Sequence, residues 1–316
     1  MLKGAAELMI RVIRLFGRGI LRLEAFLKQR AIAWLNQRAL NDYVRSDRRP
    51  WRNGYSFYRI QYIDRAIRDE ATLKVFRDTQ PLPDNYGFRV DARAIELPWA
   101  LARLAGCAGR LLDAGSSFNL DYVVTAPALA QYKITIATLA PEATCLWNLG
   151  VSYVFGDLRA LDLRDDWFDA VACISTIEHV GMDNARYAGQ AENARRASSQ
   201  DYLLAVKELR RVLKAGGTLY ITFPFGAYED HGWFQQFDAT MTDELIAAFN
   251  PSEVKESVFR YDSDGWKLSD RAACAQCQYF DVTASKYFDP RSTIEYPPDY
   301  PAAERAVMCL ELRKGR

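Results

Sequence analysis

The chain has two histidines, His179 and His231, and an imidazole is the side chain best suited to accept a proton near neutral pH. His179 follows Glu178 in the sequence Ile-Glu-His-Val, and His231 precedes Trp233 in an aromatic stretch. We expect His231 to act as a general base, slightly ahead of His179, and Glu178 is the third catalytic candidate. For each histidine the alternative is a structural hydrogen bond within its own loop.

Alternating strands and helices have to position these side chains. Five apolar or β-branched runs are predicted strands, at 110–114, 132–138, 151–155, 168–174 and 217–223. Helices are expected at 98–104, from near residue 120, at 202–213 and at 241–249, and the strands 253–261 and 306–312 complete the sheet. This order predicts an α/β fold, a mostly parallel seven-stranded Rossmann-like sheet with helices on both faces. Such sheets bind nucleotide-like ligands at the carboxyl ends of their strands.

Four short motifs lie at the ends of these elements. They are Leu112-Asp113-Ala114-Gly115, Gly156-Asp157, Ile177-Glu178-His179-Val180 and Leu213-Lys214-Ala215-Gly216-Gly217. In this order the chain resembles the class I S-adenosylmethionine-dependent methyltransferases, in particular their type 11-like group, over about its last two thirds. One glycine turn is a weak signal, whereas four motifs in the right order are a specific one. The resemblance implies the fold predicted above and S-adenosylmethionine as the cofactor.

The resemblance also implies which residues hold the cofactor. In the turn after the first strand, small residues let backbone amides approach the methionine carboxylate. Two glycines of the usual pattern are replaced here by Ser117 and Asn119, and serine hydroxyls can add hydrogen bonds. The residues expected to bind the cofactor in this turn are Asp113, Ala114, Gly115, Ser116, Ser117 and Asn119. A turn that binds no ligand is the alternative.

The second strand ends at Thr138, followed by Leu139, where methyltransferases of this kind usually carry an acid for the two ribose hydroxyls. A threonine cannot accept from both hydroxyls. We therefore expect weaker cofactor binding or help from Glu142. Asp157 is expected to accept a hydrogen bond from the adenine amino group, while Leu158 offers its backbone.

Ser175 completes the expected cofactor site, and it stands where magnesium-dependent relatives have an acid, so we predict no metal. The acceptor is expected to be a small molecule or a glycan that is methylated on oxygen with a histidine as base. Aromatic and amide side chains that suit a sugar are Trp233, Gln235, Gln236 and Trp266. The alternative is a non-catalytic binding or scaffolding protein of the same fold. A nicotinamide-dependent oxidoreductase is disfavoured, because that family needs a fuller glycine fingerprint.

Residues 2–40 contain no proline and have the period of an amphipathic helix. Its apolar face consists of Met9, Ile13, Phe16, Ile20, Leu23 and Leu27, and its basic face of Arg11, Arg14, Arg18 and Arg22. Such a helix can lie on an anionic membrane; the alternative is that it packs on protein, including its copy in a homodimer. We expect an amphipathic basic helix in 1–45, a helical, aromatic-rich cap and linker in 46–105, and the methyltransferase domain in 106–316.

The amino-acid composition limits which other classes of protein the chain could belong to. The 316 residues carry a net charge of +1, so no overall field favours nucleic acid as a partner. Six scattered cysteines suit reduced thiols, and the single Cys274-x-x-Cys277 pair lacks a second pair for zinc. Neither a secretory signal nor a membrane-spanning segment is evident in the sequence. We expect a cytoplasmic protein, with peripheral contact at the inner face of the membrane if the first helix binds lipid.

Overall fold

The structure is a computed structural model that describes residue 30, residues 32–189 and residues 194–316. The chain divides into two compact units, with the border between Tyr58 and Arg59. In the first unit, residue 30 and residues 32–45 are helical. The rest of the predicted amphipathic helix, residues 1–29 and residue 31, lies outside the described residues. The predicted domain borders after residues 45 and 105 remain a prediction.

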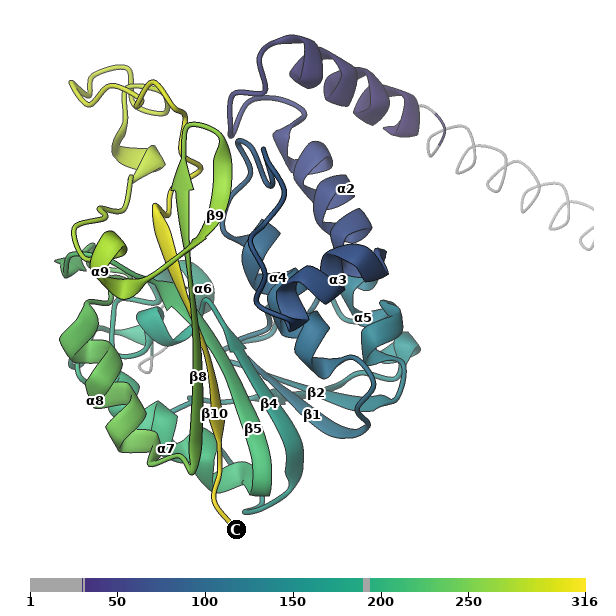
Figure 1. Cartoon of the computed structure of the whole chain (residues 1–316), viewed down its shortest axis with the longest axis vertical. Coiled ribbons are helices and arrows are strands. Elements are labelled where there is room, and N and C mark those ends of the chain that lie inside the picture. Colours follow the sequence, from purple (N-terminus) through teal and green to yellow (C-terminus); the bar gives the residue numbers. More distant parts are fainter. Residues whose placement is uncertain (1–29, 31, 190–193) are drawn as a thin grey trace, which may run out of the picture. The chain divides into compact units, whose positions relative to one another are not determined.

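Eight strands form the central sheet of the second unit, in the order β3-β2-β1-β4-β5-β10-β8-β9 (Figure 1). The strands are β1 Gly109–Ala114, β2 Tyr132–Thr138, β3 Ser152–Phe155, β4 Phe168–Ile174, β5 Leu213–Pro224, β8 Glu253–Asp262, β9 Gly265–Ser269 and β10 Ala306–Arg313. Strands β1 to β5 pair in parallel, whereas β10 is antiparallel to both β5 and β8. The predicted α/β sheet is confirmed. It has one more strand than predicted, because β9 forms a short hairpin with β8.

Helices cover both faces of this sheet (Figure 1). The helices are α2 Tyr55–Arg68, α3 Glu70–Arg77, α4 Arg93–Leu104, α5 Asp121–Val124, α6 Ala185–Ala188, α7 Tyr202–Val212, α8 Ala239–Phe249 and α9 Arg271–Cys274. The predicted helices at 202–213 and 241–249 are confirmed within two residues. Helix α4 begins five residues before the predicted residue 98, because Pro98 lies inside the helix and does not start it.

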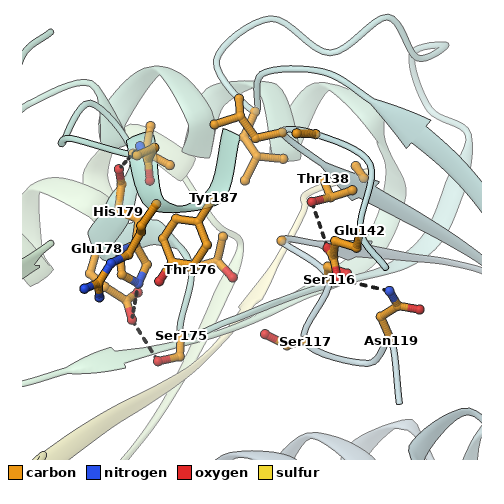
Figure 2. A pocket seen from close by; sticks show the side chains of 18 of the residues that line it. Ser116, Ser117, Asn119, Thr138, Glu142, Ser175, Thr176, Glu178, His179 and Tyr187 are labelled. Atoms are coloured by element: carbon orange, nitrogen blue, oxygen red, sulfur yellow. Dashed lines mark hydrogen bonds and ion pairs between the residues drawn. The ribbon is translucent and has the colours of Figure 1, made fainter. Parts of the chain in front are cut away.

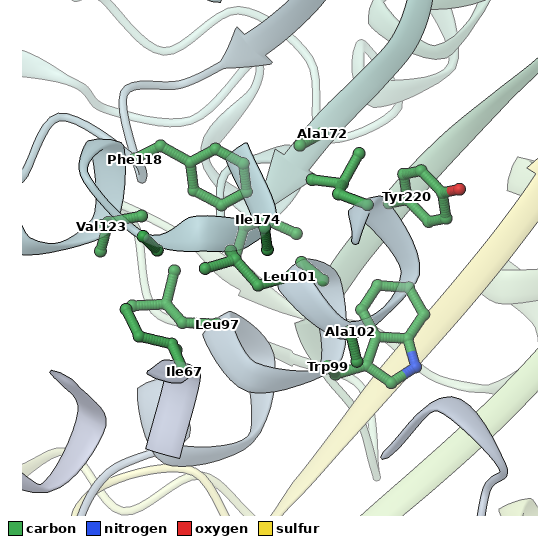
Figure 3. Packing of buried hydrophobic residues seen from close by; sticks show 14 of the residues in the cluster. Ile67, Leu97, Trp99, Leu101, Ala102, Phe118, Val123, Ala172, Ile174 and Tyr220 are labelled. Carbon is green, nitrogen blue, oxygen red and sulfur yellow. The ribbon is translucent and has the colours of Figure 1, made fainter. Parts of the chain in front are cut away.

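Two hydrophobic cores lie on opposite faces of the sheet, because successive side chains of a strand point to opposite sides. Along β1, Leu111 belongs to one core and Leu112 to the other. The first core packs α4 against the sheet, with Trp99 and Leu101 fully buried near Ile174 (Figure 3). The second core contains the apolar faces of α7 and α8. Because helices pack on both faces of the sheet, the carboxyl ends of β1 to β5 are held in place, and the loops of the site begin there.

Candidate functional site

A cavity of about 830 Å³ lies at the carboxyl ends of the parallel strands. The loops after β1, β2, β3 and β4 contribute Ser116, Thr138, Asp157 and Ser175 to its wall. The segment predicted as a cap contributes further wall residues, Arg59, Asp91, Arg93 and Glu96. Figure 2 shows the side chains in two groups, with Thr138, Glu142 and Asn119 at one end and Ser175, Glu178 and His179 at the other. We call these the cofactor end and the acceptor end.

The turn after β1 is shaped by Asp113 and Gly115. The Asp113 carboxylate accepts a hydrogen bond of 2.7 Å from the Phe118 backbone N–H, and its burial raises the pKa of that carboxyl to about 7. Gly115 has a φ of 114°, and a Cβ there would lie 2.1 Å from Thr176 Oγ1. Asp113 and Ala114, both predicted to bind the cofactor, are not among the residues that line the cavity. They therefore shape the turn, and their backbone and packing position the residues that follow.

Ser116 and Ser117 differ in what their hydroxyls do. Ser117 Oγ donates to the Ile174 carbonyl at the end of β4, so it links two loops of the site. Ser116 adopts a left-handed backbone, with a φ of 68°, and its Oγ is buried without a hydrogen-bond partner among the described residues. Burying a hydroxyl that has no hydrogen-bond partner makes the free energy of folding less favourable. Ser116 therefore fits a site that is completed by a polar ligand atom.

Glu142 is anchored at the cofactor end by two other predicted residues. Thr138 Oγ1 donates to Glu142 Oε1 at 3.0 Å, and Asn119 Nδ2 donates to Glu142 Oε2 at 3.1 Å. The Tyr153 hydroxyl donates to Asn119 Oδ1 at 2.8 Å and fixes the amide. Thr138 and Asn119 thus hold a carboxylate in the cavity wall, in the loop that follows the second strand. The expectation that Glu142 assists Thr138 in binding the cofactor stays a prediction.

Asp157 and Leu158 both line the cavity after β3, as does Leu139 after β2. The Asp157 carboxylate forms an ion pair of 2.6 Å with Arg159, which also pairs with Asp201. Its charge is therefore compensated within the protein. The remaining acceptor capacity of a carboxylate allows one further hydrogen bond.

Glu178 lies at the acceptor end, in the 3-10 turn Ile177–His179 after β4. Its side chain is 2% exposed, and its Oε1 accepts a hydrogen bond of 2.8 Å from Ser175 Oγ. Its Oε2 is buried without a hydrogen-bond partner in the described part of the chain. Burial raises the pKa of this carboxyl to about 8, so Glu178 is mostly protonated at pH 7, and its ionised form is a stronger base than an ordinary glutamate.

His179 lines the cavity beside Glu178. Its Nδ1 lies 2.9 Å from the Trp233 carbonyl oxygen, which can only accept, so the proton is on Nδ1 and the Nε2 lone pair is available. The Nε2 atom is 4.0 Å from Glu178 Oε1. Burial lowers the pKa of the imidazole to about 4. His179 is therefore neutral at pH 7 and is a weaker base than Glu178.

His231 is not among the residues that line the cavity, although the sequence favoured it slightly as the base. It lies in the hairpin between β6 Glu229–Asp230 and β7 Gln235–Gln236. Its ring stacks on Phe234 with centroids 4.3 Å apart, and its Nε2 is 3.5 Å from a Glu229 carboxylate oxygen. The preference for His231 is corrected accordingly, because the hairpin brings Trp233 to the cavity and leaves His231 in an aromatic stack.

Three of the four residues predicted to suit a sugar do not line the cavity. Trp266 is buried and donates to the Val90 carbonyl at 2.9 Å, so it belongs to the core. Gln235 and Gln236 are fully buried, and their amides donate to backbone carbonyls. Of the four residues, Trp233 alone lines the cavity.

Glu304 and Tyr279 also line the cavity, and no sequence motif marks either of them. They come from the segment between β9 and β10, far along the chain from the other site residues.

Across the described ranges, no group of three His, Cys, Asp or Glu residues could hold a metal ion. No helix in the same part of the chain is long and apolar enough to cross a membrane.

Residues 105–221 match the family of methyltransferase domains. No curated protein matches the chain. A solved structure of Burkholderia thailandensis 1,6-didemethyltoxoflavin-N1-methyltransferase, with its substrate and S-adenosylhomocysteine, is 16% identical, covers 70% of this chain and 79% of its own, and has a TM-score of 0.41. Haemonchus contortus phosphoethanolamine N-methyltransferase 2 with S-adenosyl-L-methionine is 11% identical, covering 81% of this chain and 60% of its own, with a TM-score of 0.43. The match to methyltransferase domains therefore covers the part of the chain from just before β1 into β5, which includes the loops after β1, β2, β3 and β4.

Proposed function

We propose that this chain transfers a methyl group from S-adenosylmethionine to a small-molecule acceptor, with both molecules bound in the cavity of about 830 Å³. One observation carries the proposal. The two ends of a single cavity each hold a buried polar atom without a partner among the described residues, Ser116 Oγ at the cofactor end and Glu178 Oε2 at the acceptor end. The volume is in the range of about 300–1,000 Å³ that small-molecule sites have.

The cofactor end fits the cofactor through residues that the sequence predicted. Ser116 Oγ is the proposed donor to the methionine carboxylate, and Glu142, held by Thr138 and Asn119, is the proposed acceptor for the ribose hydroxyls. Asp157 and the Leu158 backbone are proposed to contact the adenine. The remaining predicted residues, Gly115, Ser117, Leu139 and Ser175, form the wall around these groups.

The acceptor end would receive the proton that the nucleophile loses. S-adenosylmethionine supplies, when bound, a methyl group on a positively charged sulfur that leaves as a neutral thioether. Glu178 Oε2 is the proposed proton acceptor, because it has no partner in the described part and its pKa is raised to about 8 by burial. The histidine base predicted for an O-methylation is proposed to be His179 rather than His231, and it would assist through its free Nε2. A hydroxyl acceptor and an amine acceptor both have a proton to give to this pair.

Calorimetry with S-adenosylhomocysteine tests the proposal. We expect the wild-type protein to bind it, and Glu142→Ala to weaken binding about 10-fold to 100-fold, because hydrogen bonds to a charged group contribute about 1.5–3 kcal/mol. Glu295→Ala, in an exposed ion pair with Lys286 away from the cavity wall, should bind like wild type. If neither S-adenosylhomocysteine nor S-adenosylmethionine gives heat or a thermal shift at millimolar concentration, the alternative of a non-catalytic scaffold is favoured.

The location of the protein is a second part of the proposal. Residues 1–40, by the sequence pattern described above, would contact the inner face of an anionic membrane through their arginines. This would place a cytoplasmic protein at the membrane periphery. Packing of the same apolar face on a second copy of the chain is the competing role.

A further inference from the structure

Four of the carboxyl groups that line the cavity are Asp91, Glu96, Glu178 and Glu304, and the first two have arginine partners. Arg59 Nε lies 2.6 Å from Asp91, and Arg93 lies 3.3 Å from Glu96. The other two are Glu178 and Glu304. For these two, no ion pair with Lys or Arg is formed within the described part of the chain, and the Oε2 atom of each is buried without a hydrogen-bond partner there.

Glu178 and Glu304 reach the same cavity from different elements. Glu178 follows β4, whereas Glu304 lies just before β10. Both carboxyls raise the pKa of the buried Tyr279 phenol, which shows that all three share one electrostatic environment, although burial is the larger cause of that shift. Glu96 raises the pKa of both carboxyls, and Arg93 lowers both. Asp91 raises the pKa of Glu304 alone.

Arg93 and Arg186 line the same cavity, but neither forms an ion pair with Glu178 or Glu304 in the described part of the chain. Arg93 is paired with Glu96, and the Arg186 guanidinium lies 3.9 Å from the centroid of the Trp233 ring. Burial raises the pKa of Glu178 and of Glu304 to about 8, so both are mostly protonated at pH 7 when no ligand is present. Burying an unpaired carboxylate costs several kcal/mol. A ligand with positively charged N–H groups would satisfy both Oε2 atoms and compensate their charge. The aromatic ring of Tyr279 in the same wall also favours a cation, whereas the Trp233 ring already has Arg186 as its cation.

We propose that the acceptor is an amine, which binds as an ammonium ion between Glu178 and Glu304 and is methylated on nitrogen. This inference rests on the proposed methyltransferase function. An anionic acceptor is disfavoured at these two carboxyls, because it has no N–H group to donate to their Oε2 atoms, and Arg59 and Arg93 are already paired with Asp91 and Glu96. A neutral alcohol could form a hydrogen bond with the protonated carboxyls, but it would form no charge-assisted bond with either of them.

The chemical step balances with one proton released. The ammonium gives one proton to the Glu178 carboxylate, which frees the nitrogen lone pair. A nitrogen–carbon bond then forms as the methyl carbon–sulfur bond breaks, and the sulfur keeps that electron pair as a neutral thioether. The product leaves as a methylammonium ion, and Glu178 releases its proton to solvent.

Paired amines and alcohols test this inference on the full-length protein saturated with S-adenosylhomocysteine. The probes are phenethylamine against phenethyl alcohol and tryptamine against tryptophol, measured by calorimetry. In at least one pair we expect the amine to bind tenfold or more tightly, since a charge-assisted bond contributes about 1.5–3 kcal/mol. Amine affinity should also rise between about pH 6 and pH 8, because the carboxyls must lose protons to bind an ammonium, whereas alcohol affinity should not change.

Variants identify the residues responsible. Glu178→Gln and Glu304→Gln should each weaken amine binding about tenfold or more, and leave S-adenosylhomocysteine affinity unchanged, which also shows that they fold. Glu295→Gln is the matched exposed control. The inference is overturned if the amine binds no better than the alcohol in both pairs, or if the amines give no heat. It is also overturned if neither Glu178→Gln nor Glu304→Gln changes the affinity for the amine. If the wild-type protein does not bind S-adenosylhomocysteine, the proposed function itself is refuted.

Discussion

Ser116 and Ser117 are neighbours in the turn after β1, but only Ser116 Oγ lacks a partner among the described residues. We expect Ser116→Ala to weaken S-adenosylhomocysteine binding about tenfold, because one hydrogen bond to a charged carboxylate is lost. Its thermal stability should stay near that of the wild type. Ser117→Ala removes the bond to Ile174 and should lower the stability by about 1 kcal/mol. Calorimetry and urea unfolding measure both. Equal affinity of Ser116→Ala and wild type would contradict the role of Ser116.

At the residue scale, the ionisation of Glu178 should also make the stability of the folded protein depend on pH. Because burial raises its pKa in the folded protein to about 8, the folded state holds a proton that the unfolded state has lost. The stability that depends on this group is therefore present at low pH and falls by up to about 1.4 kcal/mol per pH unit as the pH rises from about 5 to about 8.

Glu178→Gln cannot ionise and keeps the shape of the side chain. We expect it to be more stable than wild type at about pH 8, with a difference that shrinks toward about pH 5, and to lose methyl transfer. Thermal unfolding over this pH range checks the sign. A variant that is equally stabilised at both pH values would show that the carboxyl does not titrate as a buried group.

At the scale of elements, the loops after β1 and β4 interlock. The Ile174 carbonyl accepts from Ser117 Oγ, from Thr176 Oγ1 at 3.1 Å and from Arg93 at 3.2 Å. Gly115 lets Thr176 approach, since a Cβ at this glycine would lie 2.1 Å from Thr176 Oγ1. The cofactor end and the acceptor end are thus held together by one junction.

Alanine substitutions test this junction. Gly115→Ala should lower the free energy of unfolding by several kcal/mol and reduce S-adenosylhomocysteine binding, because the two loops must separate. Gly106→Ala is the matched control: its φ of 79° gives the same type of backbone strain, about 1–3 kcal/mol, but a Cβ there meets nothing within 4 Å. Urea unfolding compares them. Equal losses would mean that strain alone, and not the contact with Thr176, requires a glycine at 115.

At the scale of the whole molecule, the open question is the amphipathic segment before the domain. Reversing Arg11, Arg14, Arg18 and Arg22 to Glu in the full chain should abolish flotation with phosphatidylserine vesicles, since each arginine contributes about 1 kcal/mol near an anionic surface. Neutral phosphatidylcholine vesicles are the control. Wild-type protein that stays in the soluble fraction with both vesicles, and has the mass of a dimer by light scattering, would favour packing between copies.

The sequence by itself determined the order of strands and helices, because apolar periodicity follows directly from which face of an element is buried. It also determined the loops of the site, since the carboxyl ends of parallel strands meet at one edge. The contact between Thr138 and Glu142 could be anticipated because the two residues are four positions apart, at the end of β2 and in the loop after it. These inferences all depend on local spacing.

The tertiary structure alone decided which side chains meet. His231 and His179 lie in loops that look equally suitable in sequence, but the β6–β7 hairpin turns His231 into an aromatic stack and puts Trp233 into the cavity. Glu304 lines the same cavity as Glu178 although the two residues are 126 positions apart in the chain, and no local sequence pattern encodes this. Burial then sets the pKa of these groups, and burial is a property of the packed molecule rather than of any segment.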